Sequence, residues 1–407
     1  MKLLFASDSF KGSLTSEQTI ELLTKAANEV FDDPETIGVP VADGGEGTVD
    51  AIVKAEKGET VTCSVHGPLM EKIDSGYGVI NGEQAVIEMS AASGLTLVPE
   101  DKRNPMNTTS FGTGELILHA LEKGYRKLSV AIGGSATNDG GMGCARALGA
   151  RFLDRNGNEL VGSGRDLINV HSIDMTEFDP RIKESSITVM CDVKNPLCGK
   201  DGATYTFGAQ KGATPIVQEK LEEGMCNYRN VIRKEFGVDC DNIEGTGAAG
   251  GLGAALRVFF NGKMRSGIEV VLDLIGFDER LEGVDLVVTG EGRTDWQSCF
   301  GKVMQCVGLR AKAKGIPVLG LSGSLGRNAL DICEYGVSSL MTTVNSLMSL
   351  EEALDSAGSQ WGRLSLTYFL YCLFTTICIN GIFITVLYSY PFWVDQVKMF
   401  YLIDFRS

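Results

Sequence analysis

Residues 127–149 read KLSVAIGGSATNDGGMGCARALG, and the fold prediction starts from this stretch. Its first part, 127–132, is apolar and rich in β-forming residues, which predicts a buried strand. A glycine-rich segment, 133–141, follows directly, and residues 140–149 then have the residue spacing of a helix. A strand, a glycine-rich connection and a helix are the repeating parts of an α/β fold.

The same alternation continues through the first 358 residues. It predicts an α/β fold with largely parallel sheets that helices cover on both faces. Thr15, with Gln18 three residues later, predicts a capping box at the start of the first helix. Short runs broken by Gly and Pro predict a more irregular, mixed sheet between 60 and 110. The expected strands are 2–7, 37–41, 60–66, 85–89, 127–132, 187–191, 284–289, 317–321 and 337–341, and the expected helices are 16–30, 47–56, 112–123, 140–149, 215–235, 251–260, 301–314 and 327–334.

Length and charge limit the classes of protein to consider. The chain has 407 residues, which predicts two or three domains. It carries 37 Lys and Arg against 52 Asp and Glu, a net charge of −15 that repels phosphate backbones and argues against a nucleic-acid partner. The 50 glycines have no collagen-like period and occur in clusters, which indicates loops where backbone approaches a ligand closely.

The cysteines and histidines show no metal-binding spacing. None of the eleven cysteines forms a CxxC pair, and three histidines complete no zinc motif. An odd number of cysteines scattered through apolar runs predicts reduced, buried thiols in a cytoplasmic protein. The chain opens directly on an expected strand, without the architecture of a signal peptide.

Six clusters of small, polar and acidic residues follow the expected strands. In an open α/β sheet such positions lie at the carboxyl ends of strands, where ligands bind. Any one cluster alone is more typical of a tight turn than of a ligand site, but six together predict one composite site. The clusters span residues 7–13, 42–48, 133–141, 191–196, 247–253 and 289–298.

The chemistry of these clusters suits phosphoryl transfer. The glycine runs 133–141 and 247–253 lead into helices and offer backbone N–H groups to phosphate. Neighbouring carboxylates suit Mg²⁺, and Lys11 offers a positive charge to a phosphoryl group. Standard nucleotide fingerprints are missing: Val303 follows Gly301-Lys302 where a Walker A motif needs Ser or Thr, and Asp295 replaces the last glycine of GxGxxG.

Four of these motifs identify a family resemblance. The strings ASDSFKG at 6–12, PVADGGEGT at 40–48, IGGSATNDGG at 132–141 and TGEGRTDWQS at 289–298 closely resemble the glycerate kinase family of bacterial glyoxylate and glucarate pathways. DVKNPL at 192–197 and the run 247–253 match further blocks, in order. The resemblance covers residues 1 to about 357. It implies ATP-dependent phosphorylation of D-glycerate to a phosphoglycerate, with the 2-phosphoglycerate preferred, using Mg²⁺ in the cytoplasm.

The resemblance also implies two α/β domains with the site in the cleft. We expect a Rossmann-like parallel sheet with helices on both faces, formed by residues 1–60 and 285–358. A second, mixed α/β domain at 61–284 would be inserted in it. The expected partners are D-glycerate and ATP, and a homodimer is left open.

Roles follow from the chemistry of the clusters. Asp192 is the first choice for the base that accepts the proton of the attacking hydroxyl, and Asp8 is the second. Lys11 joins them as a catalytic cation. Glu291 and Asp295 are expected on the Mg²⁺ side. The expected substrate-binding residues are Asp43, which is also the reserve metal ligand, Gly44, Gly45, Glu46, Ser135, Asn138 and Asp139, and the expected nucleotide-binding residues are Gly133, Gly134, Gly250, Gly251 and Gly253.

The composition changes near residue 358. Residues 364–394 contain no charged side chain, a run longer than the roughly 20 residues that span a bilayer. Three interpretations stay open for the apolar tail, 359–407: a transmembrane anchor, the product of a reading-frame or gene-model error, or a buried apolar helix. An alternative function follows, a membrane-anchored or catalytically impaired relative that binds glycerate or nucleotide without turnover.

Overall fold

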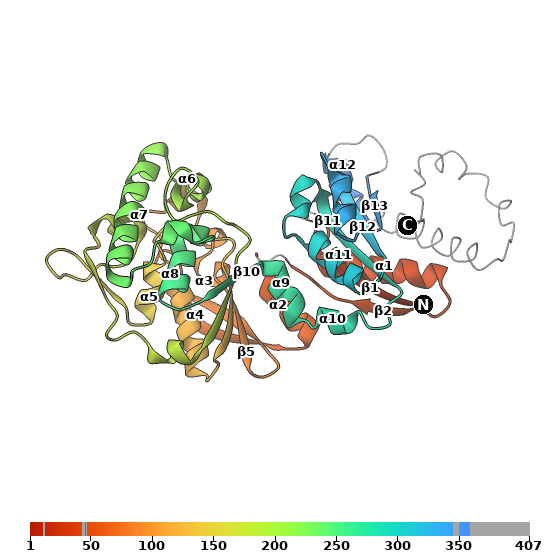
Figure 1. The fold of residues 1–407 in the computed structure, drawn as a ribbon, viewed down its shortest axis with the longest axis horizontal. Coiled ribbons are helices and arrows are strands. Elements are labelled where there is room, and N and C mark those ends of the chain that lie inside the picture. The colour runs from red at the N-terminus through yellow and green to blue at the C-terminus, as the bar shows by residue number, and fades with distance from the viewer. Residues whose placement is uncertain (11–12, 43–44, 46, 345–349, 359–407) are drawn as a thin grey trace.

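The computed structural model describes residues 1–10, 13–42, 45, 47–344 and 350–358, and it contains two large sheets (Figure 1). The first sheet has five strands in the order β13-β12-β11-β1-β2, and every neighbouring pair is parallel. Its strands come from the two ends of the described chain. They are β1 (Lys2–Ser7), β2 (Glu35–Gly38), β11 (Leu286–Thr294), β12 (Val318–Leu325) and β13 (Ser339–Thr342).

The second sheet is mixed, and all of its strands lie between those of the first sheet in sequence. Its order is β10-β9-β6-β5-β4-β3, with the β3–β4 and β4–β5 pairs antiparallel and the other pairs parallel. The α/β fold with one parallel and one mixed sheet is therefore confirmed. The strands are β3 (Glu59–His66), β4 (Lys72–Ile80), β5 (Gln84–Glu88), β6 (Lys127–Ala131), β9 (Ser186–Met190) and β10 (Lys263–Arg265).

Helices cover both sheets, and one short antiparallel ribbon lies outside them. The ribbon consists of β7 (Arg151–Leu153) and β8 (Ser172–Asp174). The α-helices in the described part of the chain are α1 (Ser16–Val30), α2 (Thr48–Glu56), α3 (Ser90–Ser93), α4 (Phe111–Glu122), α5 (Met142–Ala147), α6 (Ala203–Phe207), α7 (Pro215–Phe236), α8 (Leu252–Val258), α9 (Gly267–Leu274), α10 (Phe277–Arg280), α11 (Val303–Ala313) and α12 (Leu350–Asp355).

Strand β1 shows how the first sheet is buried on both faces. Leu3 and Phe5 belong to a core that includes Leu23 of α1. Leu4 and Ala6 point to the opposite face and belong to a different core. Alternate side chains of a strand point to opposite faces, so a strand with helices on both sides is apolar throughout.

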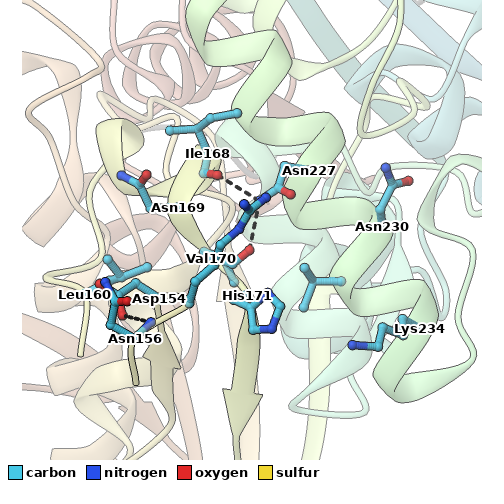
Figure 2. A pocket seen from close by; sticks show the side chains of 12 residues that line it. Asp154, Asn156, Leu160, Ile168, Asn169, Val170, His171, Asn227, Asn230 and Lys234 are labelled. Atoms are coloured by element: carbon cyan, nitrogen blue, oxygen red, sulfur yellow. Dashed lines mark hydrogen bonds between the residues drawn. The ribbon is translucent and has the colours of Figure 1, made fainter. Parts of the chain in front are cut away.

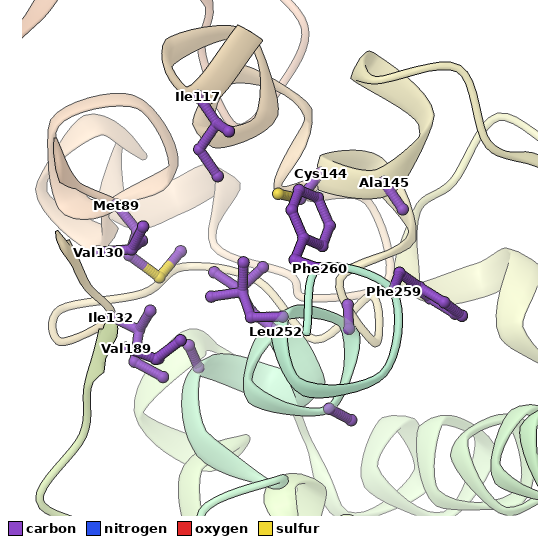
Figure 3. Close-up of a cluster of buried hydrophobic side chains, with 14 of the residues drawn as sticks. Met89, Ile117, Val130, Ile132, Cys144, Ala145, Val189, Leu252, Phe259 and Phe260 are labelled. Carbon is purple, nitrogen blue, oxygen red and sulfur yellow. The ribbon is translucent and has the colours of Figure 1, made fainter. Parts of the chain in front are cut away.

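Helices α2 and α9 lie between the two sheets (Figure 1). One core contains Leu4 of the first sheet, Val86 of the second sheet, Ile52 of α2 and Leu272 of α9. The larger core lies on the other face of the second sheet, where α4 and α8 contribute Ile117 and Leu252 (Figure 3). Residues of both sheets thus share one core with α2 and α9.

The expected elements agree with the structure where the local signals are strong. The first helix has the predicted bounds, and Thr15 and Gln18 form the predicted capping box. Residues 327–334 were expected to be a helix and instead contain the 3₁₀ helix η9 (Ala329–Tyr335). Strand β4 and helix α9 had no counterpart among the expected elements.

No helix among the described residues is long and apolar enough to cross a membrane. The predicted apolar tail, 359–407, lies outside the described residues. The division into domains at 1–60 with 285–358 and at 61–284 stays a prediction, because α2 and α9 share one core with both sheets.

Candidate active site

Two acidic residues lie at the carboxyl ends of neighbouring strands in the first sheet. Asp8 directly follows β1, and its backbone N–H donates to the carbonyl of Gly290 at 2.9 Å. Ser7 is paired with Gly290 in the parallel register, and Glu291 is the next residue of β11. Asp8 and Glu291 therefore lie at the same edge of the sheet, as expected for clusters that follow parallel strands.

Glu291 is nearly buried, and two hydroxyl groups hold one of its carboxylate oxygens. Oε1 accepts a hydrogen bond from the Thr294 hydroxyl at 3.0 Å and another from the Ser298 hydroxyl. Burial raises the pKa of Glu291, while these hydroxyl groups and the charge of Lys302 act in the opposite direction. Both side-chain hydrogen bonds from described residues go to Oε1, and the assignment of Glu291 as a metal ligand stays a prediction.

Asp295 has structural partners of its own. Its Oδ1 accepts the N–H of Gln297 at 2.9 Å and caps the 3₁₀ helix η8 (Trp296–Cys299). Its Oδ2 lies 3.3 Å from Nε of Arg293. These contacts explain the orientation of the Asp295 carboxylate after β11. The assignment of Asp295 as a metal ligand stays a prediction.

The loop after β6 presents backbone N–H groups at an exposed turn. Gly133 is half-buried and Gly134 is exposed. Among the described residues no acceptor takes the N–H of Gly133 or Gly134, although the Gly134 carbonyl accepts from the N–H of Leu95 at 2.9 Å. Ser135 is nearly buried and forms an isolated bridge with Gly94. Backbone N–H groups in a loop after a strand can bind an anionic oxygen.

Buried polar side chains brace the rest of this loop. Asp139 is fully buried and accepts hydrogen bonds from the N–H and hydroxyl of Ser110 at 2.7 and 2.8 Å, and from the N–H of Gly141 at 3.0 Å. Burial raises the pKa of Asp139, and these hydrogen bonds partly offset the rise. Asn138 is also buried and donates to the Thr204 hydroxyl at 3.1 Å. Both side chains thus support the loop, and their contact with substrate stays a prediction.

Lys211 is a buried cation that the sequence reasoning missed. It is 2% exposed, and its Nζ donates to the carbonyl of Thr137 at 2.7 Å, within the braced loop. Burial lowers the pKa of Lys211 to about 7, and the negative charge of Asp139 acts against this. Lys211 ends the short 3₁₀ helix η5 (Ala209–Lys211), which carries no recognisable ligand pattern.

The second glycine cluster packs against the first. Gly250 has a φ of +64°, and a Cβ there would lie 2.0 Å from the carbonyl oxygen of Thr137. Its own carbonyl accepts the N–H of Gly140 at 2.9 Å. Gly251 and Gly253 are also buried with no room for a side chain. Close backbone packing explains why glycine is needed at these three positions. Their contact with nucleotide stays a prediction.

Asp192 lies where the two sheets meet. It follows β9 and is exposed, and its Oδ1 accepts from the Ser266 hydroxyl at 2.9 Å and the Gly267 N–H at 2.8 Å, at the start of α9. Gly301 reaches this place from the first sheet, since a Cβ on it would lie 3.8 Å from the Ser266 hydroxyl oxygen. Asp192 is thereby oriented by α9, beside a loop of the opposite sheet.

Glu88 is a second residue that the sequence reasoning missed. It ends β5 and is nearly buried, and its carboxylate accepts from the N–H groups of Gly47 and Val49 at 2.9 and 3.3 Å and from the Ser90 hydroxyl at 2.9 Å. Burial raises its pKa, and these donors lower it. A signal was available, because Glu88 lies at the carboxyl end of an expected strand.

Within the 42–48 cluster, the start of α2 is defined by contacts of Gly45. Gly45 is described, and its carbonyl accepts from the Thr48 hydroxyl at 2.7 Å at the start of α2. The other predicted residues of this cluster, and the predicted catalytic lysine, lie outside the described residues: Asp43, Gly44, Glu46 and Lys11.

A pocket of about 670 Å³ lies elsewhere, between residues 154–171 and α7 (Figure 2). Its Asn227 Nδ2 donates to the carbonyls of Leu167 and Val170, both at 2.9 Å, which ties α7 to the preceding loop. None of the sequence-predicted site residues lines it. We therefore place the candidate active site at the strand ends of the two sheets, where carboxylates and backbone N–H groups suit phosphoryl transfer.

Comparisons with known proteins agree with the resemblance inferred from the sequence. The family model described as "Glycerate kinase family" matches residues 3–366. The glycerate 2-kinase of Escherichia coli K12 is 45% identical over 358 residues, covering 88% of this chain and 94% of that protein. The glycerate kinase of Bacillus cereus is 44% identical with the same two coverages.

A solved structure agrees with the fold. A crystal structure of a candidate glycerate kinase 2 from Salmonella typhimurium LT2 superposes with a TM-score of 0.83 at 41% identity, covering 92% of this chain and 99% of that one. Sequence and fold thus match along nearly the whole length of these proteins. The chain belongs to the glycerate kinase family.

Proposed function

We propose that this chain transfers the γ-phosphoryl group of ATP to D-glycerate and that the product is 2-phosphoglycerate. Family membership supports the kinase activity, and the printed name of the Escherichia coli relative supports position 2. The observation that supports the proposal within the fold is the pair Asp8 and Glu291 at one edge of the first sheet. Asp192, oriented by the start of α9, and Gly133–Gly134 follow strands of the second sheet.

Asp192 is the proposed base. Its carboxylate is exposed, and Ser266 and Gly267 fix its orientation through Oδ1. A fixed, accessible carboxylate can accept the proton of the glycerate hydroxyl as that oxygen attacks phosphorus. Asp8 is the alternative base, since it lies at the carboxyl end of β1.

The exposed N–H groups of Gly133 and Gly134 are the proposed contacts for anionic oxygens. Glycerate carries a carboxylate and ATP carries phosphates, and both accept hydrogen bonds from backbone donors. Lys11 is proposed to add a positive charge to this region, and residues 43–46 to contact the substrate.

Mg²⁺ is the proposed metal, with Glu291 as its main protein ligand. The fit rests on Oε2 of Glu291, since the side-chain hydrogen bonds from described residues occupy Oε1. Asp295 is the second proposed ligand, but its present contacts to Gln297 and Arg293 would have to change. When bound, Mg²⁺ neutralises charge on the transferring phosphoryl group.

The substrate test is an ADP-release assay with the full-length chain. D-glycerate should be turned over at least about 100-fold more efficiently than glycerol, because glycerol leaves donors that bind the carboxylate unpaired. Similar efficiency with the two substrates would contradict the proposal. ATP and glycerate binding without ADP release would instead support the impaired relative considered from the sequence.

The test of the base uses Asp192→Asn. This change keeps an oxygen that can accept from Ser266 and Gly267 but removes the base, so kcat should fall by roughly 10²–10⁴ with a small change in KM. Asp201→Asn is the matched control, because Asp201 is exposed in the segment that follows. A normal kcat in Asp192→Asn would transfer the role to Asp8.

A further inference from the structure

Two cysteines and a glutamate that are far apart in sequence meet beside α7. Cys198 follows the 191–196 cluster, while Glu222 and Cys226 lie four residues apart on α7 and so share one helix face. The two sulfur atoms and a carboxylate oxygen all lie within 4.8 Å of one another. Within the described residues this is the one group of three or more such side chains close enough to hold a metal ion.

One oxygen in this group is buried without a hydrogen bond. Glu222 is 8% exposed, and its Oε1 accepts from the Gly199 N–H at 2.6 Å and the Cys226 thiol at 3.6 Å. No described residue donates to the buried Oε2 of Glu222. A buried carboxylate oxygen without a partner destabilises a fold, which indicates that another group meets it.

The ligand types select the metal. Thiolates favour Zn²⁺ and similar soft ions, whereas Mg²⁺ and Ca²⁺ take oxygen ligands. Tetrahedral zinc, with Zn–S bonds of about 2.3 Å, needs sulfur atoms just under about 4 Å apart. In this structure the ligand atoms lie within 4.8 Å of one another, so the two thiols would move closer together when the ion binds.

We propose that Cys198 Sγ, Cys226 Sγ and Glu222 Oε2 bind one Zn²⁺ ion, with a water molecule as fourth ligand. The partial exposure of Cys226 gives the ion and the water access to the site. This proposal does not depend on the kinase activity, and it is separate from the Mg²⁺ site proposed at Glu291.

Charges around the cluster are compatible with zinc. Burial raises the pKa of both thiols, so Cys198 and Cys226 are protonated without metal. Binding therefore releases two protons, and Zn²⁺ with two thiolates and one carboxylate carries a charge of −1. The guanidinium of Arg229 opposes the rise in both thiol pKa values, so it favours the thiolates.

Asp241 connects the guanidinium of Arg229 to the cluster. Its Oδ2 lies 2.6 Å from Nη1 of Arg229, and its Oδ1 accepts the backbone N–H of Cys198 at 3.1 Å. Outer contacts of this kind orient the ligands of a metal site. Bound zinc would fasten the segment between Asp192 and Cys198 to α7.

The test is a Co²⁺ titration of the full-length, reduced and chelator-treated chain with Mg²⁺ in excess. Co²⁺ bound to thiolates gives a charge-transfer band in the near ultraviolet, so one equivalent should produce this band and Zn²⁺ should abolish it. Cys198→Ser and Cys226→Ser should each weaken binding by at least about 100-fold, because losing a ligand costs more than losing an outer contact. Glu222→Gln should keep the thiolate band and weaken binding.

Cys63→Ser is the matched control, because Cys63 is a partly buried thiol outside the cluster and should leave the titration unchanged. Absence of a thiolate band in the parent chain would overturn the proposal even if a variant failed to fold. A band that persists in the Cys198→Ser, Cys226→Ser double variant would also overturn it. So would a Cys198–Cys226 disulfide whose reduction restores no metal uptake.

Discussion

The buried amino group of Lys211 makes the free energy of unfolding depend on pH. The amino group has a pKa of about 7 in the folded protein and about 10.4 in an unfolded chain. Between these values the unfolded chain holds a proton that the folded protein lacks, so the free energy of unfolding rises with pH by up to about 1.4 kcal/mol per unit. Below pH 7 both states hold the proton and this contribution to the slope disappears.

Lys211→Met removes this titration. Chemical denaturation at several pH values between 7 and 9 should give a smaller rise of stability with pH in the variant than in the parent chain. Buried thiols contribute equally to the pH dependence of stability in both proteins. Their contribution therefore cancels when the slope of the variant is subtracted from the slope of the parent chain. Equal slopes would show that the Lys211 amine keeps an ordinary pKa.

Close packing between the two glycine clusters, 133–141 and 247–253, predicts how Gly250 responds to substitution. Gly250→Ala places a Cβ 2.0 Å from the Thr137 carbonyl at a φ of +64°. Gly237→Ala has nearly the same φ, +68°, but its Cβ meets nothing within 4 Å. The control should lose about 1 kcal/mol from backbone strain alone, and Gly250→Ala should lose at least about 2 kcal/mol more. Equal losses in thermal or urea unfolding would contradict the loop packing.

Secondary structure could be predicted where the signal is local. The first helix follows from its capping box. Helix α9 has only eight residues, which is shorter than the run of about 11–18 residues over which a helical period can be recognised. Strand β4 contains Gly76 and Gly78, which suggested a break; Gly78 is needed because a Cβ there would lie 2.5 Å from Cγ2 of Val53.

Residues of the candidate site could also be predicted only where the signal is local in the sequence. Clusters after strands pointed to Asp8, Glu291 and Asp192, because parallel strands bring their carboxyl ends together. Lys211 and the Cys198 cluster depend on contacts between distant segments, so no local spacing could reveal them.

Both sheets and their hydrophobic cores lie within residues 2–342. We therefore expect a chain ending at residue 358 to keep the kcat and KM that the full-length chain has for D-glycerate. Steady-state assays of the two proteins, with circular dichroism to compare folding, measure this. A folded but inactive shortened chain would show that residues 359–407 take part in catalysis.

The central claim is that this member of the family phosphorylates D-glycerate at position 2. The most direct measurement is ³¹P nuclear magnetic resonance of the products that the full-length chain forms from ATP, Mg²⁺ and D-glycerate. We predict 2-phosphoglycerate in amounts equal to ADP. Accumulation of 3-phosphoglycerate, or ADP formed without any phosphoglycerate, would contradict the account.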